Sequence, residues 1–186
     1  MNILGIGQAG CRITKQFDNF PQYNTFFIDV KNEGNYKNFF KIEEQTTHEE
    51  YERNYKFLNL DVEKDTTIVL TGTGKISGII LRLLEQFKNK KLNILYIRSD
   101  LSTASEKENL RDRLVFGILQ QYARSNLLSR LYVVSNMAVE SALEKVSIPS
   151  YWQDINNVII STYHMLNVFE NTEPVLSTFS NPGITS

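Results

Sequence analysis

Short apolar runs alternate along the chain with longer segments in which apolar residues recur every three or four positions. Five runs have the composition of strands in the interior of a sheet, at residues 2–6, 23–30, 66–70, 91–99 and 129–136. Four segments have helical periodicity, at residues 8–20, 79–87, 106–125 and 151–171. Because strands and helices alternate, the pattern predicts an α/β fold, with a doubly wound, mostly parallel sheet flanked by helices.

The segment between the second and third predicted strands is less regular. Residues 31–65 are rich in polar and aromatic side chains, and a helix within residues 46–57 would begin at Thr46 or Thr47, which can cap it ahead of acidic residues. A chain of 186 residues has the length of about one domain. We therefore expect one domain over residues 1–172, and over 173–186 a polar tail or the start of a missing region.

Two glycine clusters follow predicted strands and precede predicted helices. The first, from Gly5 to Gly10, has the spacing G-x-G-x-x-G, in which main-chain N–H groups and the end of the next helix can bind phosphate. The second spans residues 71–78 and offers a second set of amides. It is not a Walker A loop, because Ile76 stands where a magnesium-binding Ser or Thr is required. Both clusters are expected at the carboxyl edge of the sheet, where ligands of such folds bind.

Taken alone, the first cluster fits two kinds of nucleotide. Asp29, nineteen residues after Gly10, is placed to bind the ribose of a dinucleotide in a Rossmann-type protein. A dinucleotide does not usually need the second glycine loop, whereas a mononucleotide with two or three phosphates does. Lys75 could reach such a phosphate, although a solvated loop lysine is the simpler interpretation.

Both clusters resemble motifs of the tubulin/FtsZ superfamily. "GIGQAGCRI" (5–13) is similar to its first phosphate loop, and "LTGTGK" (70–75) stands where the family carries its glycine-rich signature. Only Gly72-Thr73-Gly74 matches the core of that signature, and the flanking residues depart from it. The resemblance implies binding of GTP or GDP, with Mg²⁺ held through the phosphates only. The implied phosphate-binding residues are Gly7, Gln8, Ala9, Gly10, Cys11, Arg12, Gly72, Thr73, Gly74 and Lys75.

The resemblance extends to the base and the ribose. "PSYWQDINNVIIST" (149–162) looks like the start of the family's central helix, which implies that Tyr151 stacks on guanine and that Asn156, or its neighbour Asn157, reads the base edge. Glu108 and Arg111 lie where the family places ribose-contacting residues, although their spacing also fits an ordinary surface pair. Asn136, at a strand end, would line the ribose side.

The catalytic acids of the family are not matched. Its N-x-D-x-x-D loop, counted from Pro174, falls on Thr178, Ser180 and Gly183, and none of these carries a carboxylate. No catalytic residue is assigned, and little or no GTP hydrolysis is expected. The resemblance implies a role in assembly or protein interaction, through self-association or with other subunits. A nucleotide-free structural component of a larger assembly is the remaining alternative.

Charge and composition limit the kinds of partner and the location that we expect. A net charge of −1 gives no reason to expect nucleic acid or a membrane surface as a partner, and no apolar run approaches the 18 or so residues that span a bilayer. Cys11 is the one cysteine, so no internal disulfide forms and a reducing, cytoplasmic location is expected, with Cys11 packed in the interior. His48 and His164 stand apart from each other and from Cys11, so no metal site is expected.

Overall fold

The fold was analysed in a computed structural model of the chain, which describes residues 1–60, 65–88, 90–143 and 148–172. Over these ranges the chain forms one six-stranded sheet in which every pair of neighbouring strands is parallel. The strands are β1 (Asn2–Ile6), β2 (Asn24–Asp29), β3 (Phe39–Lys41), β4 (Thr66–Thr71), β5 (Leu92–Arg98) and β6 (Arg130–Ser135). Their order across the sheet is β3-β2-β1-β4-β5-β6.

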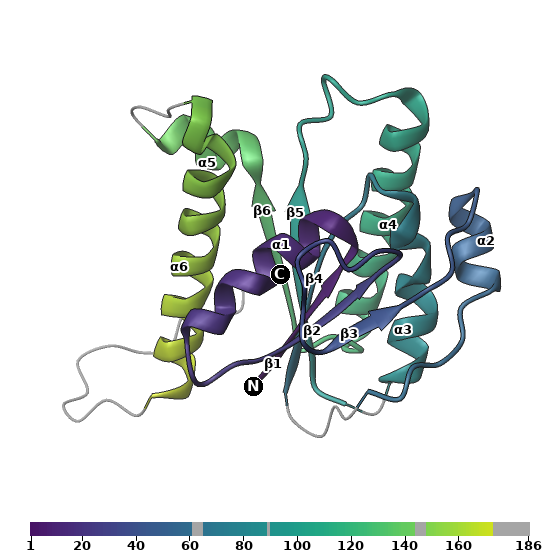
Figure 1. Cartoon of the computed structure of the whole chain (residues 1–186), viewed down its shortest axis with the longest axis horizontal. Helices are drawn as coiled ribbons and strands as arrows, with labels where there is room; N and C mark the ends of the chain where they lie inside the picture. Colours follow the sequence, from purple (N-terminus) through teal and green to yellow (C-terminus); the bar gives the residue numbers. More distant parts are fainter. Residues whose placement is uncertain (61–64, 89, 144–147, 173–186) are drawn as a thin grey trace.

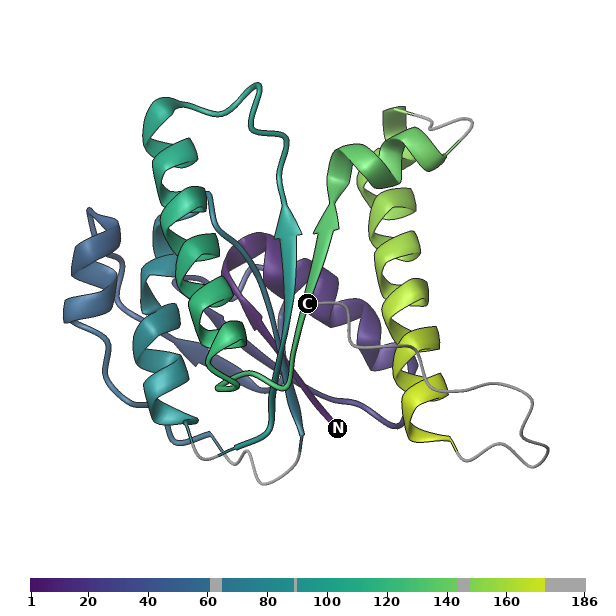
Figure 2. The same ribbon diagram turned by 180° about the vertical axis from the view of Figure 1, so that it is seen from behind.

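Helices cover both faces of the sheet, as Figures 1 and 2 show from opposite sides. The helices are α1 (Gly7–Gln16), α2 (His48–Arg53), α3 (Ile80–Gln86), α4 (Glu106–Arg124), α5 (Asn136–Ala142) and α6 (Tyr151–Asn171). Short 3₁₀ turns are formed by Phe17–Asn19, Lys75–Ile79 and Ile148–Ser150. Helices α1 and α6 pack on one face, and α2, α3 and α4 lie on the other.

The central strands bury side chains on both faces. Along β1, Ile3 packs on the side of α1 and α6, whereas the next residue, Leu4, packs on the side of α3 and α4. On β4 the same alternation holds for Val69 and Ile68. This two-sided burial is why these strands are apolar without interruption, instead of alternating between apolar and polar residues.

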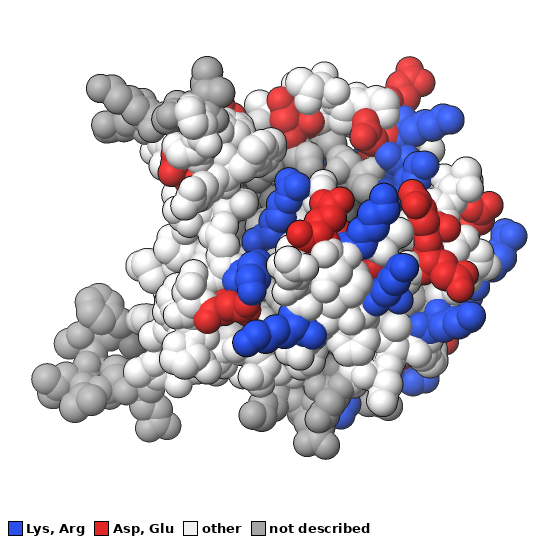
Figure 3. Space-filling view, viewed as in Figure 1, with Lys and Arg blue, Asp and Glu red and all other residues white. Residues whose placement is uncertain are grey.

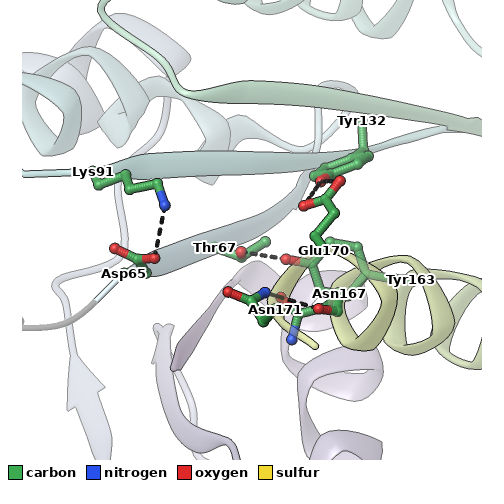
Figure 4. A network of polar contacts seen from close by, with 8 residues as sticks. All are labelled: Asp65, Thr67, Lys91, Tyr132, Tyr163, Asn167, Glu170 and Asn171. Atoms are coloured by element: carbon green, nitrogen blue, oxygen red, sulfur yellow. Dashed lines mark hydrogen bonds and ion pairs between the residues drawn. The ribbon is translucent and has the colours of Figure 1, made fainter. Parts of the chain in front are cut away.

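Helix α6 is held to the sheet by a polar network at its C-terminal half (Figure 4). The Tyr163 and Thr67 hydroxyls are hydrogen-bonded at 2.5 Å, and the Tyr132 hydroxyl donates to Glu170 at 3.2 Å. Arg130 adds an ion pair with Glu170 at 3.0 Å. Because Thr67 lies near the start of β4, this half of α6 lies near the amino end of that strand. Its first turn lies at the opposite, carboxyl edge of the sheet (Figure 1).

The structure confirms the α/β fold with a parallel sheet, and it adds elements that the pattern did not predict. Strand β3, helix α5 and the 3₁₀ turns are new, and the helix expected over 8–20 is α1 followed by one such turn. The tail, residues 173–186, lies outside the described residues. In the described part of the chain, no helix is long and apolar enough to span a membrane.

Charged side chains are mixed on the surface. Figure 3 shows Lys and Arg interspersed with Asp and Glu over the viewed face, without a broad region of one sign. The part formed by α6 is largely uncharged, since its charged residues are Asp154 and Glu170.

Candidate functional site

The first glycine cluster forms the open N-terminus of α1. Strand β1 passes directly into the helix at Gly7, whose φ of +68° is a left-handed conformation that favours glycine. Ile6 precedes the helix in an extended conformation, no side chain caps the helix, and its first turn contains no acid. The first amides of α1 therefore have no partner within the helix, and they carry the positive end of its dipole.

The second glycine cluster leaves β4, the strand next to β1. The pairing of Gly5 with Val69 shows that the two strands are in register close to their carboxyl ends. The loop then turns into the 3₁₀ segment Lys75–Ile79, where the Ser77 hydroxyl donates to the Gly74 carbonyl at 2.6 Å. The two clusters lie against each other, since a Cβ added to Gly7 would lie 2.7 Å from Cγ2 of Ile76.

The two clusters therefore meet where the strand order reverses. Strands 2 and 3 lie on one side of β1, and strands 4, 5 and 6 lie on the other. Crevices at such a reversal, beyond the carboxyl ends of the strands, are the usual ligand sites of open α/β sheets. Helix N-termini and glycine loops at such a place are the main-chain features with which proteins bind anions.

Of the two ribose candidates on α4, Arg111 contacts the second loop. Its Nε donates to the Thr73 carbonyl at 2.7 Å. Glu108 is used locally, because its carboxylate accepts hydrogen bonds from the Ser105 backbone N–H at 2.8 Å and the Ser105 hydroxyl at 2.7 Å in a capping box. These bonds lower the pKa of Glu108. The Glu108 side chain therefore bonds to Ser105, the residue that caps α4.

The other residues of the first cluster divide between surface and interior. Gln8, Ala9 and Arg12 are exposed, and the Gln8 amide donates to Glu33 at 2.9 Å. Cys11 is fully buried, its thiol lies 3.5 Å from the Gly5 carbonyl, and burial raises its pKa to about 12. This confirms that Cys11 is a packed residue. Its contact with a ligand would be through the main chain. In the second loop, Lys75 is exposed.

A pocket of about 270 Å³ adjoins the start of α1 at the carboxyl end of β2. Its lining consists of Gln8, Arg12, Asp29, Lys31, Glu33, Gly34 and Tyr36. Burial raises the pKa of Asp29, the charge of Glu33 adds to this, and a hydrogen bond from the Val30 N–H opposes it. The pocket contains the acid that the sequence offered as a dinucleotide ribose ligand.

The residues expected at the base lie at the start of α6. Tyr151 and Asn156 are half-buried, and the Tyr151 hydroxyl donates to Glu140 of α5 at 2.8 Å. Figure 1 shows this end of α6 beside α5, at the same edge of the sheet as the N-terminus of α4. Asn136, the first residue of α5, has a buried side-chain oxygen without a hydrogen-bond partner among the described residues.

Sequence analysis missed three side chains beneath the second loop: Tyr96, Arg98 and Asp112. The Tyr96 hydroxyl donates to Asp112 at 2.6 Å, and Arg98 Nε lies 3.7 Å from the same carboxylate. Burial, followed by the bond to Asp112, raises the pKa of Tyr96. A signal was present, because Asp112 stands three and seven residues before the buried Val115 and Leu119, on the apolar face of its helix.

The described residues contain no group of three His, Cys, Asp or Glu side chains that could hold a metal ion. His48 begins α2, and its pKa is lowered, chiefly by burial. His164 packs against Phe20, with the two rings tilted by 32°, and is hydrogen-bonded to the Tyr23 hydroxyl at 2.9 Å. The three positions of the expected catalytic loop, Thr178, Ser180 and Gly183, lie outside the described residues.

Fold and loops together define a doubly wound parallel α/β domain with two glycine loops at the reversal of strand order. No model of a known protein family matches the chain, and no curated protein matches it by sequence. Among solved structures, the empty FtsZ dimer of M. jannaschii superposes with a TM-score of 0.67 at 11% sequence identity. The match covers 95% of this chain and 56% of that FtsZ chain, so this chain spans about half of its length. The likeness shows a tubulin/FtsZ-like fold.

Proposed function

We propose that this domain binds GTP or GDP, with the phosphates at residues 7–12 and 72–75. The observation that carries this proposal is the contact between the uncapped start of α1 and the second glycine loop, at the carboxyl ends of neighbouring strands. One loop suffices for the single pyrophosphate of a dinucleotide, whereas two loops suit a chain of two or three phosphates. The FtsZ-like fold supports the same assignment.

The charges around the loops favour an anion. The first turn of α1 carries no acid, and Arg111 joins the second loop through its Nε, which leaves its other guanidinium N–H groups for further acceptors. Lys75 is exposed beside the same loop. Any Mg²⁺ would be held through the phosphates, and it would neutralise part of their charge.

The base and the ribose would extend toward α6. Tyr151 offers a half-exposed ring for stacking, and Asn156 offers both a donor and an acceptor to the edge of guanine. Because the Tyr151 hydroxyl is bonded to Glu140, the face of its ring is the part left for a base. Arg111 would contact both the second loop and the ribose. Glu108 could contact the ribose only if its hydrogen bonds to Ser105 were broken.

A binding experiment with two variants of Ala9 tests the proposal. Ala9 is exposed in the first turn of α1, so Ala9→Glu places a carboxylate beside the phosphates while its charge also suits the helix dipole. Calorimetric titration with GTP and GDP should show a loss of at least about tenfold, or 1.4 kcal/mol, for Ala9→Glu. The neutral control Ala9→Gln should bind like the wild type. If both variants bound GTP and GDP equally well, the phosphates would not lie at this end of α1.

The biological role that fits such a site is assembly or protein interaction, by self-association or with other subunits. Little or no turnover is expected, because hydroxyl and glycine residues stand at Thr178, Ser180 and Gly183, and a missing general base typically costs 10²–10⁴-fold. Phosphate release from GTP, measured over a series of protein concentrations up to those at which the chain self-associates, should stay at the uncatalysed level. Multiple turnovers per chain would contradict this expectation.

A second candidate is a Rossmann-type dinucleotide protein. The strand order is that of the dinucleotide-binding folds, and the pocket at β2 places Asp29 beside the start of α1. Two further variants separate the candidates. Gly74→Asp, which has room for its side chain, should weaken GTP alone, whereas Asp29→Asn should weaken NAD alone. Titrations of GTP, ATP and NAD against both variants decide between a mononucleotide and a dinucleotide.

A further inference from the structure

A buried carboxylate lies directly beneath the second glycine loop. Asp112 of α4 is 0% exposed, and its Oδ1 accepts the hydrogen bond from Tyr96 of β5 at 2.6 Å. Its Oδ2 has no hydrogen-bond partner among the described residues, although Arg98 Nε forms an ion pair with it at 3.7 Å. A buried acid of this kind adds little stability in comparison with apolar residues of similar volume, so its presence calls for another explanation.

The loop rests on this acid and its partner. A Cβ at Gly72 would collide with the Tyr96 hydroxyl, and it would lie 2.8 Å from the Asp112 Cα and 2.9 Å from its Oδ1. The main chain at Gly72 is thus in direct contact with the hydrogen-bonded pair. Any side chain at Gly72 would require the loop to move.

Helix α4 holds the next loop residue as well. Arg111, the neighbour of Asp112, donates its Nε to the Thr73 carbonyl. Two consecutive residues of α4 therefore contact two consecutive residues of the loop, one from the partly exposed side and one from the core. These two contacts restrain the position and the direction of the main chain at Gly72 and Thr73.

An aromatic residue one turn further along α4 restrains the same pair. Phe116 stacks on the Tyr96 ring with 5.4 Å between the ring centroids, and the Arg98 guanidinium lies 4.9 Å from the Phe116 centroid. Ring stacking and a cation over a ring both favour one orientation of each group. The ring of Tyr96 is therefore restrained by packing against Phe116, and its hydroxyl is restrained by the hydrogen bond to Asp112.

We propose that Asp112 is a positioning residue, which acts through Tyr96 to hold the main chain of residues 72–74 in the conformation that presents its amides to an anion. The effect on nucleotide binding rests on the proposed function, whereas the effect on the loop does not. Asp112 itself is 0% exposed, so its proposed action on the loop runs through Tyr96 and through packing against Gly72.

Tyr96→Phe tests the proposal, with Tyr163→Phe as its matched control. Each variant removes one buried tyrosine hydroxyl, but Tyr163 is bonded to Thr67 at the opposite end of β4. Amide hydrogen exchange of the ligand-free protein should be at least about tenfold faster at residues 72–77 in Tyr96→Phe than in Tyr163→Phe. GTP affinity should fall about fivefold or more in Tyr96→Phe alone. A purely structural loss would speed exchange throughout the chain, whereas the proposal predicts an increase confined to residues 72–77.

Two Asp112 variants add a graded comparison. Asp112→Asn keeps an acceptor for Tyr96, so exchange at residues 72–77 should stay closer to that of the wild type than in Asp112→Ala. If Asp112→Ala does not fold, Tyr96→Phe and Asp112→Asn still give the answer. Equal exchange at residues 72–77 in Tyr96→Phe and Tyr163→Phe would overturn the proposal. Faster exchange in Tyr96→Phe, in a protein whose wild type binds no GTP, would support the positioning role and contradict the proposed function.

Discussion

At the scale of single residues, glycine has different roles at different positions. Gly7 needs a left-handed main chain at the start of α1, whereas Gly10 is needed for close packing, because a Cβ there would lie 2.5 Å from the Val69 carbonyl oxygen. Gly10 thereby allows α1 to approach β4, and with it the second glycine loop. Gly117 of α4 has no atom within 4 Å of its missing Cβ, so only its helix propensity matters.

This contrast gives a matched pair of substitutions. Gly10→Ala should lower the free energy of unfolding by about 1–3 kcal/mol, since the carbonyl it meets belongs to the main chain of the central sheet. Gly117→Ala should raise it by about 0.4–1 kcal/mol, because alanine restricts the unfolded chain and has room in the folded one. Urea unfolding of both variants measures the two changes. A loss at Gly117 similar to the loss at Gly10 would contradict the packing argument.

At the scale of elements, the structure shows which of two threonines caps α2, a choice that the sequence left open. The Thr47 hydroxyl accepts a hydrogen bond from the Glu50 N–H at 3.2 Å, and the Glu50 carboxylate accepts one from the Thr47 N–H at the same distance. Thr46 contributes only its backbone N–H, which donates to Glu50 at 2.9 Å. The cap matters for the site because Gly78, the last residue of the second glycine cluster, packs closely against the His48 carbonyl at the start of α2.

Thr47→Ala should therefore cost about 1 kcal/mol of stability, the usual effect of removing a threonine cap. Thr46→Ala should change stability by less than about 0.5 kcal/mol, because its backbone bond is retained. Thermal unfolding of the two variants under the same conditions makes the comparison. If Thr46→Ala proves the more damaging of the two, the capping box is wrongly assigned.

The elements also show what the sequence could predict. Long segments with a clear apolar pattern, such as residues 66–70 and 106–125, are found as strand and helix within two residues of the expected ends. Strand β3 was missed because three residues are too few to establish a period. Helix α5 was missed although it is as long as α3, and its position depends on packing against β6 and α6.

The candidate site, like the fold, could be predicted only in part from the sequence. The spacing of the glycines placed both loops at strand ends, since that spacing follows from main-chain geometry. The Tyr96–Asp112 pair was not found, because its members are sixteen residues apart and on different elements. The local use of Glu108 depends on Ser105, a capping pattern that can be read from the sequence and was overlooked.

At the scale of the whole molecule, one long helix connects the two edges of the sheet. The first turn of α6 carries Tyr151 at the carboxyl edge, and its last turns are tied to Thr67 and Arg130 by the network of Figure 4. The domain spans about half of the FtsZ chain that it resembles. Helix α6 thereby joins the carboxyl edge of the sheet, where both glycine clusters lie, to the opposite edge.

The position of β1 in the sheet also constrains how the protein is made. β1 is synthesised before both of its neighbours in the sheet, β2 and β4, and Asn2 pairs with Thr66. A ribosome extending the chain at about 5–20 residues per second leaves one side of β1 uncovered until β4 has emerged. Such pairing across a long stretch of sequence slows folding. The nascent chain therefore exposes the unpaired edge of an apolar strand for several seconds, and a chaperone that shields this edge would act before the second glycine loop has emerged.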